Sequence, residues 1–79
     1  MYKVYILKSL TSNRYYIGHT ENLEARLGRH NRGLVKSTKA YKPWEIVYSE
    51  SKDSKNEAYK REFQIKSYKG GGAFKKLID

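Results

Sequence analysis

The sequence predicts an α+β fold, a small three-stranded antiparallel sheet flanked by helices, in the order ββαβα plus a short C-terminal helix. Three observations predict it. Two β-prone runs joined by a short polar turn open the chain, apolar residues later recur at helical spacing, and a capping motif starts the second long helix. A chain of 79 residues has space for one core, so we expect residues 1–79 to form a single domain.

The first two strands are predicted to form a hairpin. Residues 2–9 are rich in Val, Ile, Leu and Tyr, and a second β-prone run extends from about residue 14 to residue 19. The turn residues 11–13 between them make antiparallel pairing the default. In any register in which the numbers of paired residues add to an odd value, Tyr5 and Tyr16 share a face of the sheet. We expect such a register.

The first helix follows the hairpin directly. Thr20 or Asn22 can cap its N-terminus, and Leu23 and Leu27 form an apolar pair one turn apart. Gly33 is a suitable stop, because glycine adopts the left-handed conformation that often ends a helix.

A polar, basic loop is expected over residues 34–42, followed by the third strand over residues 44–49. Strict alternation along this strand would place Trp44, Ile46 and Tyr48 on one face.

The second long helix is predicted by a capping box, in which Ser54 is followed three residues later by Glu57. This helix should reach Tyr68, where the glycines at 70–72 end it. A last short helix then carries the apolar residues of the segment 74–78.

Charge is the strongest signal in the composition. The chain has 17 Lys and Arg against 8 Asp and Glu, a net charge of +9 and a pI near 9.8. These cations are spread over the whole length, which favours a folded basic surface that binds nucleic acid. An anionic membrane surface is the alternative, but no basic helix with a broad apolar face supports it.

Other classes of protein are disfavoured. The longest early apolar run, residues 4–7, is too short for a signal core or a membrane span. With no cysteine, the chain has neither disulfides nor a thiolate zinc site, which fits a reducing cytoplasm.

Glu62 is the sharpest single indication of function. On a helical wheel it lies between apolar neighbours on both sides, namely Ala58, Ile65, Tyr59 and Phe63. A carboxylate in an apolar arc is costly unless it is paired or binds a cation. One carboxylate with water ligands is enough for Mg²⁺, although not for a two-metal site. The alternative is a glutamate that reaches solvent or pairs with Lys66.

Arg26 and His30 lie one turn apart on the first helix. Arginine can bind a phosphate bidentately and stabilise the charge of a pentacoordinate transition state. The alternative is a solvated basic helix face shared with Arg29 and Arg32. His30 could orient a water, relay a proton or contact a phosphate, or be a surface polar residue. His19 is expected to be structural or a phosphate contact.

Tyr5 and Tyr16 are two of eight tyrosines, so each alone carries little information. A catalytic phenol needs its pKa of about 10 lowered by cations or a metal, whereas most strand tyrosines are packing residues. Gly18 permits close approach of backbone or substrate, or marks a bulge.

Three lysines of the basic loop, Lys36, Lys39 and Lys42, lie close in sequence to Tyr41 and Trp44. This pattern indicates a phosphate-contacting loop with an aromatic platform, or a mobile basic loop.

Together these residues resemble the GIY-YIG nuclease superfamily, in particular its small stand-alone bacterial members. The segment Lys3-Val4-Tyr5 stands where that family has G-I-Y, and Tyr16-Ile17-Gly18 matches Y-I-G. Arg26, His30 and Glu62 fall at the family's arginine, histidine and metal-binding glutamate. The resemblance covers nearly the whole chain and implies a small three-stranded antiparallel sheet flanked by helices.

The resemblance also implies a mechanism. Members cut DNA with one divalent cation in a single displacement. By this likeness Tyr5 or Tyr16 would activate or orient water, and Arg26 would stabilise the phosphorane. His30 would assist proton transfer or positioning, and Glu62 would hold Mg²⁺ or Mn²⁺ near the leaving 3′ oxygen.

The chain departs from the family pattern in two places. Lys3 replaces a glycine found in many members, and it could crowd the hairpin entrance or add a phosphate contact. Many members also place an asparagine beyond the metal glutamate, whereas this chain has no asparagine after Asn56. Lys66 or Lys69 could substitute for it electrostatically.

The expected function is therefore a metal-dependent DNA endonuclease, structure-directed or weakly sequence-specific, acting in repair or recombination. It would be a monomer or weak homodimer, with RNA as a possible further substrate and a larger repair complex as a possible partner. The rival interpretations are a non-catalytic nucleic-acid-binding module and an accessory subunit of a repair complex. The expected nucleic-acid contacts are Lys3, His19, Arg29, Lys36, Lys39, Lys42 and Lys66.

Overall fold

The computed structural model describes residues 1–79 and confirms the predicted α+β order. Its elements are β1 (Tyr2–Ser9), β2 (Tyr15–Thr20), α1 (Leu23–Asn31), a 3₁₀ turn η1 (Lys39–Tyr41), β3 (Trp44–Lys52), α2 (Lys55–Ser67) and α3 (Gly72–Ile78). The 3₁₀ turn lies within the segment expected to be an irregular loop. None of the helices has the length and apolar character needed to cross a membrane.

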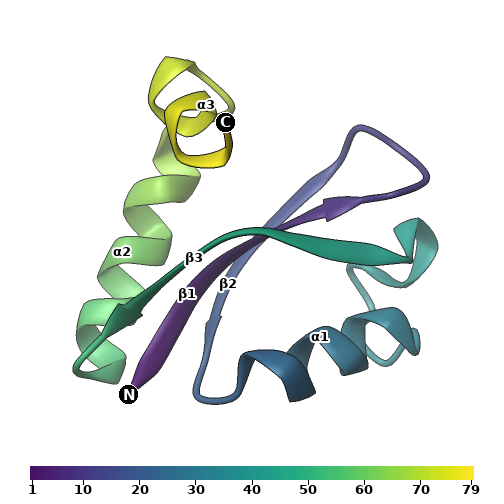
Figure 1. The fold of residues 1–79 in the computed structure, drawn as a ribbon, viewed down its shortest axis with the longest axis horizontal. Coiled ribbons are helices and arrows are strands. Elements are labelled where there is room, and N and C mark those ends of the chain that lie inside the picture. The colour runs from purple at the N-terminus through teal and green to yellow at the C-terminus, as the bar shows by residue number, and fades with distance from the viewer.

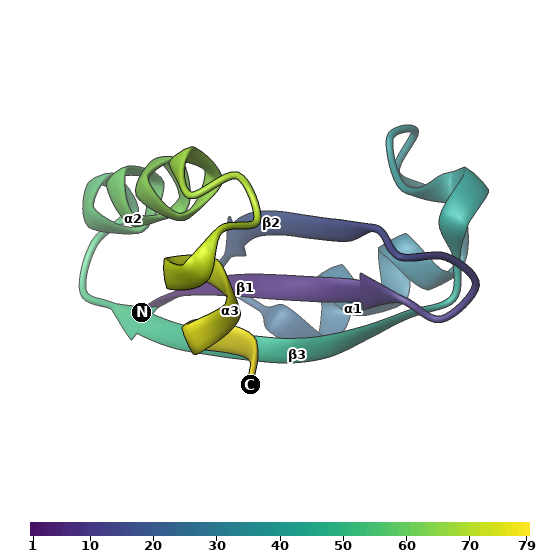
Figure 2. The ribbon, with the colours of Figure 1, turned by 90° about the horizontal axis from the view of Figure 1, so that it is seen from above.

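The sheet has three antiparallel strands in the order β2-β1-β3, so the first strand is central. Helices α2 and α3 cover one face and α1 lies against the other, as the two ribbon views show (Figure 1, Figure 2). Successive side chains of β1 point to alternate faces of the sheet. The central strand therefore contributes to two cores.

The two cores differ in chemistry. On the α2 and α3 side the core is aliphatic with one phenylalanine, built from Val4, Ile6, Ala58, Ile65 and Phe74. On the α1 side it consists of Tyr5, Leu7 and Trp44, with Tyr16, Leu23, Leu27 and Tyr41 packed around it. The predicted tyrosines, Tyr5 and Tyr16, both lie on the α1 side.

The hairpin register confirms the expected parity. Tyr5 pairs with Gly18 and Leu7 pairs with Tyr16, so the two tyrosines are diagonal neighbours on one face. Their ring centroids lie 6.2 Å apart. A Cβ atom at Gly18 would lie 2.7 Å from the Tyr5 hydroxyl oxygen. The Tyr5 ring therefore crosses directly over Gly18, so a side chain, rather than the backbone or substrate of the prediction, approaches this glycine, and the strand pairing is regular there.

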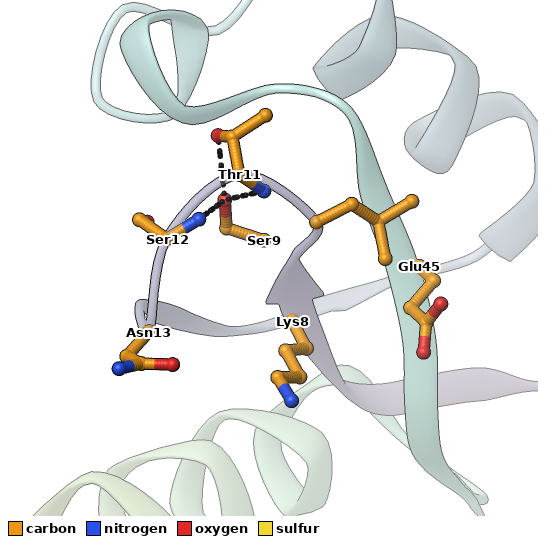
Figure 3. A pocket seen from close by; sticks show the side chains of 7 residues that line it. Lys8, Ser9, Thr11, Ser12, Asn13 and Glu45 are labelled. Carbon is orange, nitrogen blue, oxygen red and sulfur yellow. Dashed lines mark hydrogen bonds between the residues drawn. The ribbon is translucent and has the colours of Figure 1, made fainter.

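The hairpin turn is organised by one serine hydroxyl (Figure 3). The Ser9 oxygen accepts hydrogen bonds from the backbone N–H groups of Thr11 and Ser12, each at 3.1 Å. It also donates to the carbonyl oxygen of Tyr41 at 2.6 Å. The turn is thereby joined to η1, the segment that precedes β3.

Helix α1 begins and ends as expected. The Asn22 side chain accepts a hydrogen bond from the N–H of Ala25 at 3.1 Å, so Asn22 rather than Thr20 is the cap. At the other end, Gly33 has a φ of +75°. Its N–H and that of Leu34 bond back to the carbonyls of His30 and Arg29, at 3.2 and 3.0 Å, which is the Schellman arrangement.

The prediction that Trp44, Ile46 and Tyr48 share a face is wrong. Ile6 pairs with Tyr48 and Leu7 with Ile46, so one extra β3 residue is inserted as a bulge between these pairs. Tyr48 consequently packs against the aliphatic core, while Trp44 belongs to the aromatic core on the other face. An alternating pattern cannot reveal a bulge when the inserted residue is itself apolar.

Helix α2 begins at the predicted cap, because the Ser54 hydroxyl oxygen accepts from the N–H of Glu57 at 3.2 Å, which is the serine half of the capping box. The helix is joined to β3 by an ion pair of 2.7 Å between Arg61 Nε and Glu50 Oε1. Burial raises the pKa of Glu50, but hydrogen bonds from Arg61 and two further side chains outweigh burial and lower it overall. This ion pair orients the part of α2 that carries Glu62.

Candidate active site

A chain of hydrogen bonds links β1 to the loop after α1 through His30. The Tyr5 hydroxyl lies 3.2 Å from His30 Nε2, and His30 Nδ1 lies 2.8 Å from the Thr38 hydroxyl oxygen. The Thr38 hydroxyl in turn donates to the carbonyl of Val35 at 3.3 Å. Because that proton is used, Thr38 accepts from His30 Nδ1–H, and His30 Nε2 accepts from the Tyr5 hydroxyl. All three side chains are buried.

The imidazole is held neutral. Burial, and after it the positive charges of Arg26 and Arg29, together lower the pKa of His30 to about 4. At neutral pH, Nε2 therefore presents a lone pair to the Tyr5 proton. A bound phosphate would offset the two arginine charges and make this nitrogen more basic.

The two phenols differ in environment. Burial raises the pKa of Tyr5 to about 12, although the Arg26 guanidinium acts in the opposite direction. Tyr16 is only partly buried, and its ring lies 4.7 Å from the His30 ring. The pKa of Arg26 is raised, first by its interaction with Tyr5 and, after an opposing effect of burial, also by Tyr16. Arg26 therefore lies at both phenols.

Glu62 is engaged through both oxygens. Its Oε1 lies 2.6 Å from His19 Nδ1, and Lys66 Nζ donates to its Oε2 at 2.6 Å. The side chain is 14% exposed. The pairing of Glu62 with Lys66, given above as the alternative to a metal-binding role, thus occurs, and His19 on β2 is a second partner. The charge of Glu62 is the last of several effects that act on the pKa of Tyr5, and it raises that pKa.

The apolar arc around Glu62 is only half buried. Ala58 and Ile65 are fully buried, as the helical wheel predicts. Tyr59 and Phe63, on the other flank, are 56% and 67% exposed. Glu62 therefore lies at the boundary between the core and the surface of α2, where a carboxylate can contact a ligand.

The carboxylate can be tested for its fit to a divalent cation. No group of three or more His, Cys, Asp or Glu side chains is placed to hold a metal ion. The structure therefore offers one anionic ligand, Glu62 on α2, whereas the Tyr5 phenol lies on the α1 face of the sheet. This arrangement fits Mg²⁺, which commonly keeps several waters and takes further oxygens from phosphate. The ion would have to displace Lys66 or His19 from Glu62.

The remaining predicted nucleic-acid contacts are distributed around this cluster. Arg29 is exposed on α1 beside His30, and Lys36 is exposed on the following loop. Lys39 and Lys42 both approach Gly33, at the end of α1. Lys3 instead donates to the Ser51 hydroxyl at 2.8 Å and so is engaged with β3. Among these side chains, Lys3 is the one that points toward β3 and away from β2.

Two features of the site were not predicted. Thr38 is buried and fixes the orientation of His30, but a single threonine in a polar loop carries no periodic signal. The contact between His19 and Glu62 joins residues 43 positions apart, so no local pattern could reveal it.

A hollow of about 430 Å³ at the hairpin turn contains none of the predicted site residues (Figure 3).

Comparison with known proteins extends over most of the chain. A family model described as the GIY-YIG catalytic domain matches residues 1–74. A UPF0213 protein of Staphylococcus haemolyticus is 46% identical over 66 residues, which cover 82% of this chain and 79% of that protein. A UPF0213 protein of Staphylococcus aureus is 42% identical over 66 residues, with the same coverage of 82% and 79%. The solution NMR structure of a UPF0213 protein from Bacillus halodurans aligns over 92% of this chain and 90% of that chain, with 29% identity and a TM-score of 0.49.

Proposed function

Because the chain belongs to the GIY-YIG family, a superfamily of nucleases, we propose that it is a divalent-metal-dependent endonuclease that hydrolyses phosphodiester bonds in DNA. The observation that carries the proposal is the hydrogen bond between the Tyr5 hydroxyl and the neutral His30, beside the Arg26 guanidinium. A pure phosphate-binding surface needs only lysines and arginines. A buried pair of a phenol and an imidazole has no use in such a surface.

Tyr5 and His30 form a route for the proton of the attacking water. With a pKa of about 12, Tyr5 is a poor base by itself. Because Tyr5 is only 1% exposed, substrate binding would first have to open its hydroxyl to water. If Tyr5 then accepts a proton from that water while it passes its own proton to His30 Nε2, no phenolate has to form. Phosphate binding favours this transfer, since it offsets the two arginine charges that add to burial in lowering the pKa of His30. Tyr16, which packs on His30, orients the water.

Arg26 and Glu62 act on the phosphate. As the water oxygen bonds to phosphorus and the bond to the 3′ oxygen breaks, Arg26 stabilises the additional negative charge of the phosphorane. Glu62 would hold the divalent cation, Mg²⁺ or Mn²⁺, which would supply stabilisation of negative charge. The leaving 3′ oxygen takes a proton from solvent water, so the products are a 5′-phosphate and a 3′-hydroxyl. Lys66 and His19 orient the Glu62 carboxylate before the cation arrives.

The substrate scope follows from the charge. These residues have a net charge of +9, and their cations can contact the phosphate backbone, a contact that carries no sequence information. We therefore assign structure-directed or weakly sequence-specific cleavage, in repair or recombination, by a monomer or weak homodimer in the cytoplasm. RNA is a second candidate substrate, and a larger repair complex is a candidate partner.

The test is a cleavage assay on branched, flapped and linear DNA of one sequence, with Mg²⁺, Mn²⁺ or EDTA. Glu62→Ala and Arg26→Ala should each abolish nicking that depends on the cation. Glu45→Ala and Arg32→Ala are matched controls, because both side chains are exposed and outside the cluster. The controls should cut like the unmodified protein.

Binding without cutting, unchanged by Glu62→Ala, would instead support a non-catalytic nucleic-acid-binding module or an accessory subunit. The specific observation in favour of this rival is that both oxygens of Glu62 already have partners. Cleavage that continues in EDTA would contradict the assigned role of the cation.

A further inference from the structure

A second hollow adjoins the candidate active site. It has a volume of about 360 Å³ and lies between the start of β2 and the loop that carries η1. Its lining includes Arg14, Tyr16, Ser37, Thr38, Tyr41 and Trp44. Tyr16 and Thr38 are the two residues that also contact His30. Any molecule in the hollow would therefore lie next to the group being cleaved.

One wall of the hollow carries an arginine without an acidic partner. The guanidinium carbon of Arg14 lies 4.3 Å from the centroid of the Tyr41 ring. Arg14 takes part in none of the ion pairs of the protein. Stacking on Tyr41 holds the planar guanidinium in place while its N–H groups stay available for a phosphate.

The walls are fixed before any ligand arrives. Trp44 Nε1–H donates to the carbonyl of Thr38 at 3.0 Å, which joins the strand to the loop. The carbonyl of Tyr41 is held by the Ser9 hydroxyl of the hairpin turn at 2.6 Å. A preformed, partly aromatic site with a few fixed polar groups is typical of small-ligand binding, for which volumes of about 300–1,000 Å³ are usual.

From this juxtaposition we propose that the hollow binds an unpaired nucleotide next to the cleaved phosphate, with the base against the aromatic side chains and its phosphate on Arg14. The inference rests on the proposed nuclease function and names the feature of the substrate that the site selects. A base in a duplex has both faces stacked and its edge paired, so only an unpaired base can enter. The substrate class is single-stranded or branched nucleic acid.

The direct test is a titration of the ¹⁵N-labelled protein with a thymidine tetranucleotide in EDTA. The chain has one tryptophan, so the indole N–H of Trp44 gives one signal that reports on the hollow. We expect shifts of this signal and of the Ser37 and Tyr41 amides, and much smaller shifts with a blunt 12-base-pair duplex at equal phosphate concentration. Equal responses to both probes, shifts confined to α2, or no shift at all would overturn the proposal.

Variants give an independent readout by fluorescence anisotropy with a labelled single strand, again in EDTA. Arg14→Ala should weaken binding roughly tenfold, the scale of losing one stacked and phosphate-bound nucleotide. Arg14→Lys should recover part of the lost affinity for the single strand. Lys76→Ala removes an equal charge from α3 and should have a much smaller effect. Equal losses for Arg14→Ala and Lys76→Ala would overturn the proposal. Because neither binding test needs cleavage, their failure is distinguishable from a failure of the nuclease assay.

Discussion

At the scale of single residues, the site depends on which atoms are free to accept a proton. Thr38 sets the orientation of His30, and His30 receives the hydrogen bond of Tyr5. These roles depend on a buried histidine that stays neutral. Burial and the two arginines that lower the pKa of His30 to about 4 provide that condition.

The low pKa of His30 predicts a dependence of stability on pH. The folded protein binds this proton near pH 4, whereas the unfolded chain binds it near 6.5. Between these values the unfolded state holds more protons, so the free energy of unfolding should fall as the pH is lowered from about 6.5 to about 4. The total loss should be about 3 kcal/mol.

Urea denaturation at pH 7.5, 5.5 and 4.5 measures this dependence. His30→Gln keeps one donor and one acceptor but does not titrate, so its unfolding free energy should change less over the same interval. Parallel pH profiles for the two proteins would contradict a neutral buried His30.

Gly18 predicts a second residue-level effect. In Gly18→Ala the new Cβ would lie 2.9 Å from Tyr5 Cζ and 3.1 Å from Tyr16 Cε2, so both rings must shift. We expect a loss of stability of about 1–3 kcal/mol, as for other overpacked cores, together with a loss of cleavage. Gly72→Ala is the control, because no atom lies within 4 Å of its new Cβ and a helix favours alanine. Chemical denaturation of both variants measures the difference.

Lys66 predicts an effect on metal binding that does not depend on activity. Replacing it with methionine frees Oε2 of Glu62 and removes a competing positive charge. The affinity for Mn²⁺ should rise roughly two- to fivefold, the equivalent of one exposed ion pair. Lys60→Met, which also removes one positive charge from α2, should change the affinity for Mn²⁺ less. Isothermal titration calorimetry measures both, and a lower affinity for Lys66→Met would contradict competition.

The residues of the site were predicted unequally well. Tyr5, Tyr16, Arg26, His30 and Glu62 were named from local patterns together with the resemblance to the GIY-YIG family, and their catalytic roles stay predictions. The partners that orient them could not be named. Thr38 lies in an irregular loop, and His19 meets Glu62 only through the packing of α2 on the sheet. Tertiary contacts of this kind leave no local trace in a single sequence.

At the scale of elements, α2 serves both the core and the site. Its buried residues Ala58 and Ile65 fix it on the sheet, and the ion pair of Arg61 with Glu50 sets its rotation. Glu62 follows Arg61 directly, so its direction depends on both contacts. The bounds of α2 could be predicted from its capping box, whereas the bulge in β3 could not, because an apolar insertion keeps the strand hydrophobic.

Two substitutions two residues apart in α2 separate the buried and exposed sides of this helix, because the two side chains point about 200° apart around its axis. Ile65→Ala leaves a cavity beneath the sheet and should lower the free energy of unfolding by about 2–5 kcal/mol. Phe63→Ala, at a side chain that is 67% exposed, should change it by no more than about 0.5 kcal/mol. Thermal or urea denaturation compares them, and similar losses would show that α2 packs through a different face.

At the scale of the whole molecule, the strand order β2-β1-β3 puts Tyr5 on the central strand, where both neighbouring strands hold the backbone in place. Helix α1 brings Arg26 and His30 to one face, and α2 brings Glu62 to His19 on β2. The site thus takes side chains from four elements. The charge of +9 surrounds it with attraction for a polyanion.

The measurement that tests the central claim most directly is single-turnover cleavage and binding of one branched DNA by the unmodified protein and Glu62→Gln. Glutamine keeps the shape of Glu62 but removes the charge that holds the cation. We expect cleavage in Mg²⁺ by the unmodified protein, a rate at least about 100-fold lower for Glu62→Gln, and similar DNA affinity in EDTA for both. Equal cleavage rates, or tight binding with no cleavage by the unmodified protein, would contradict the account.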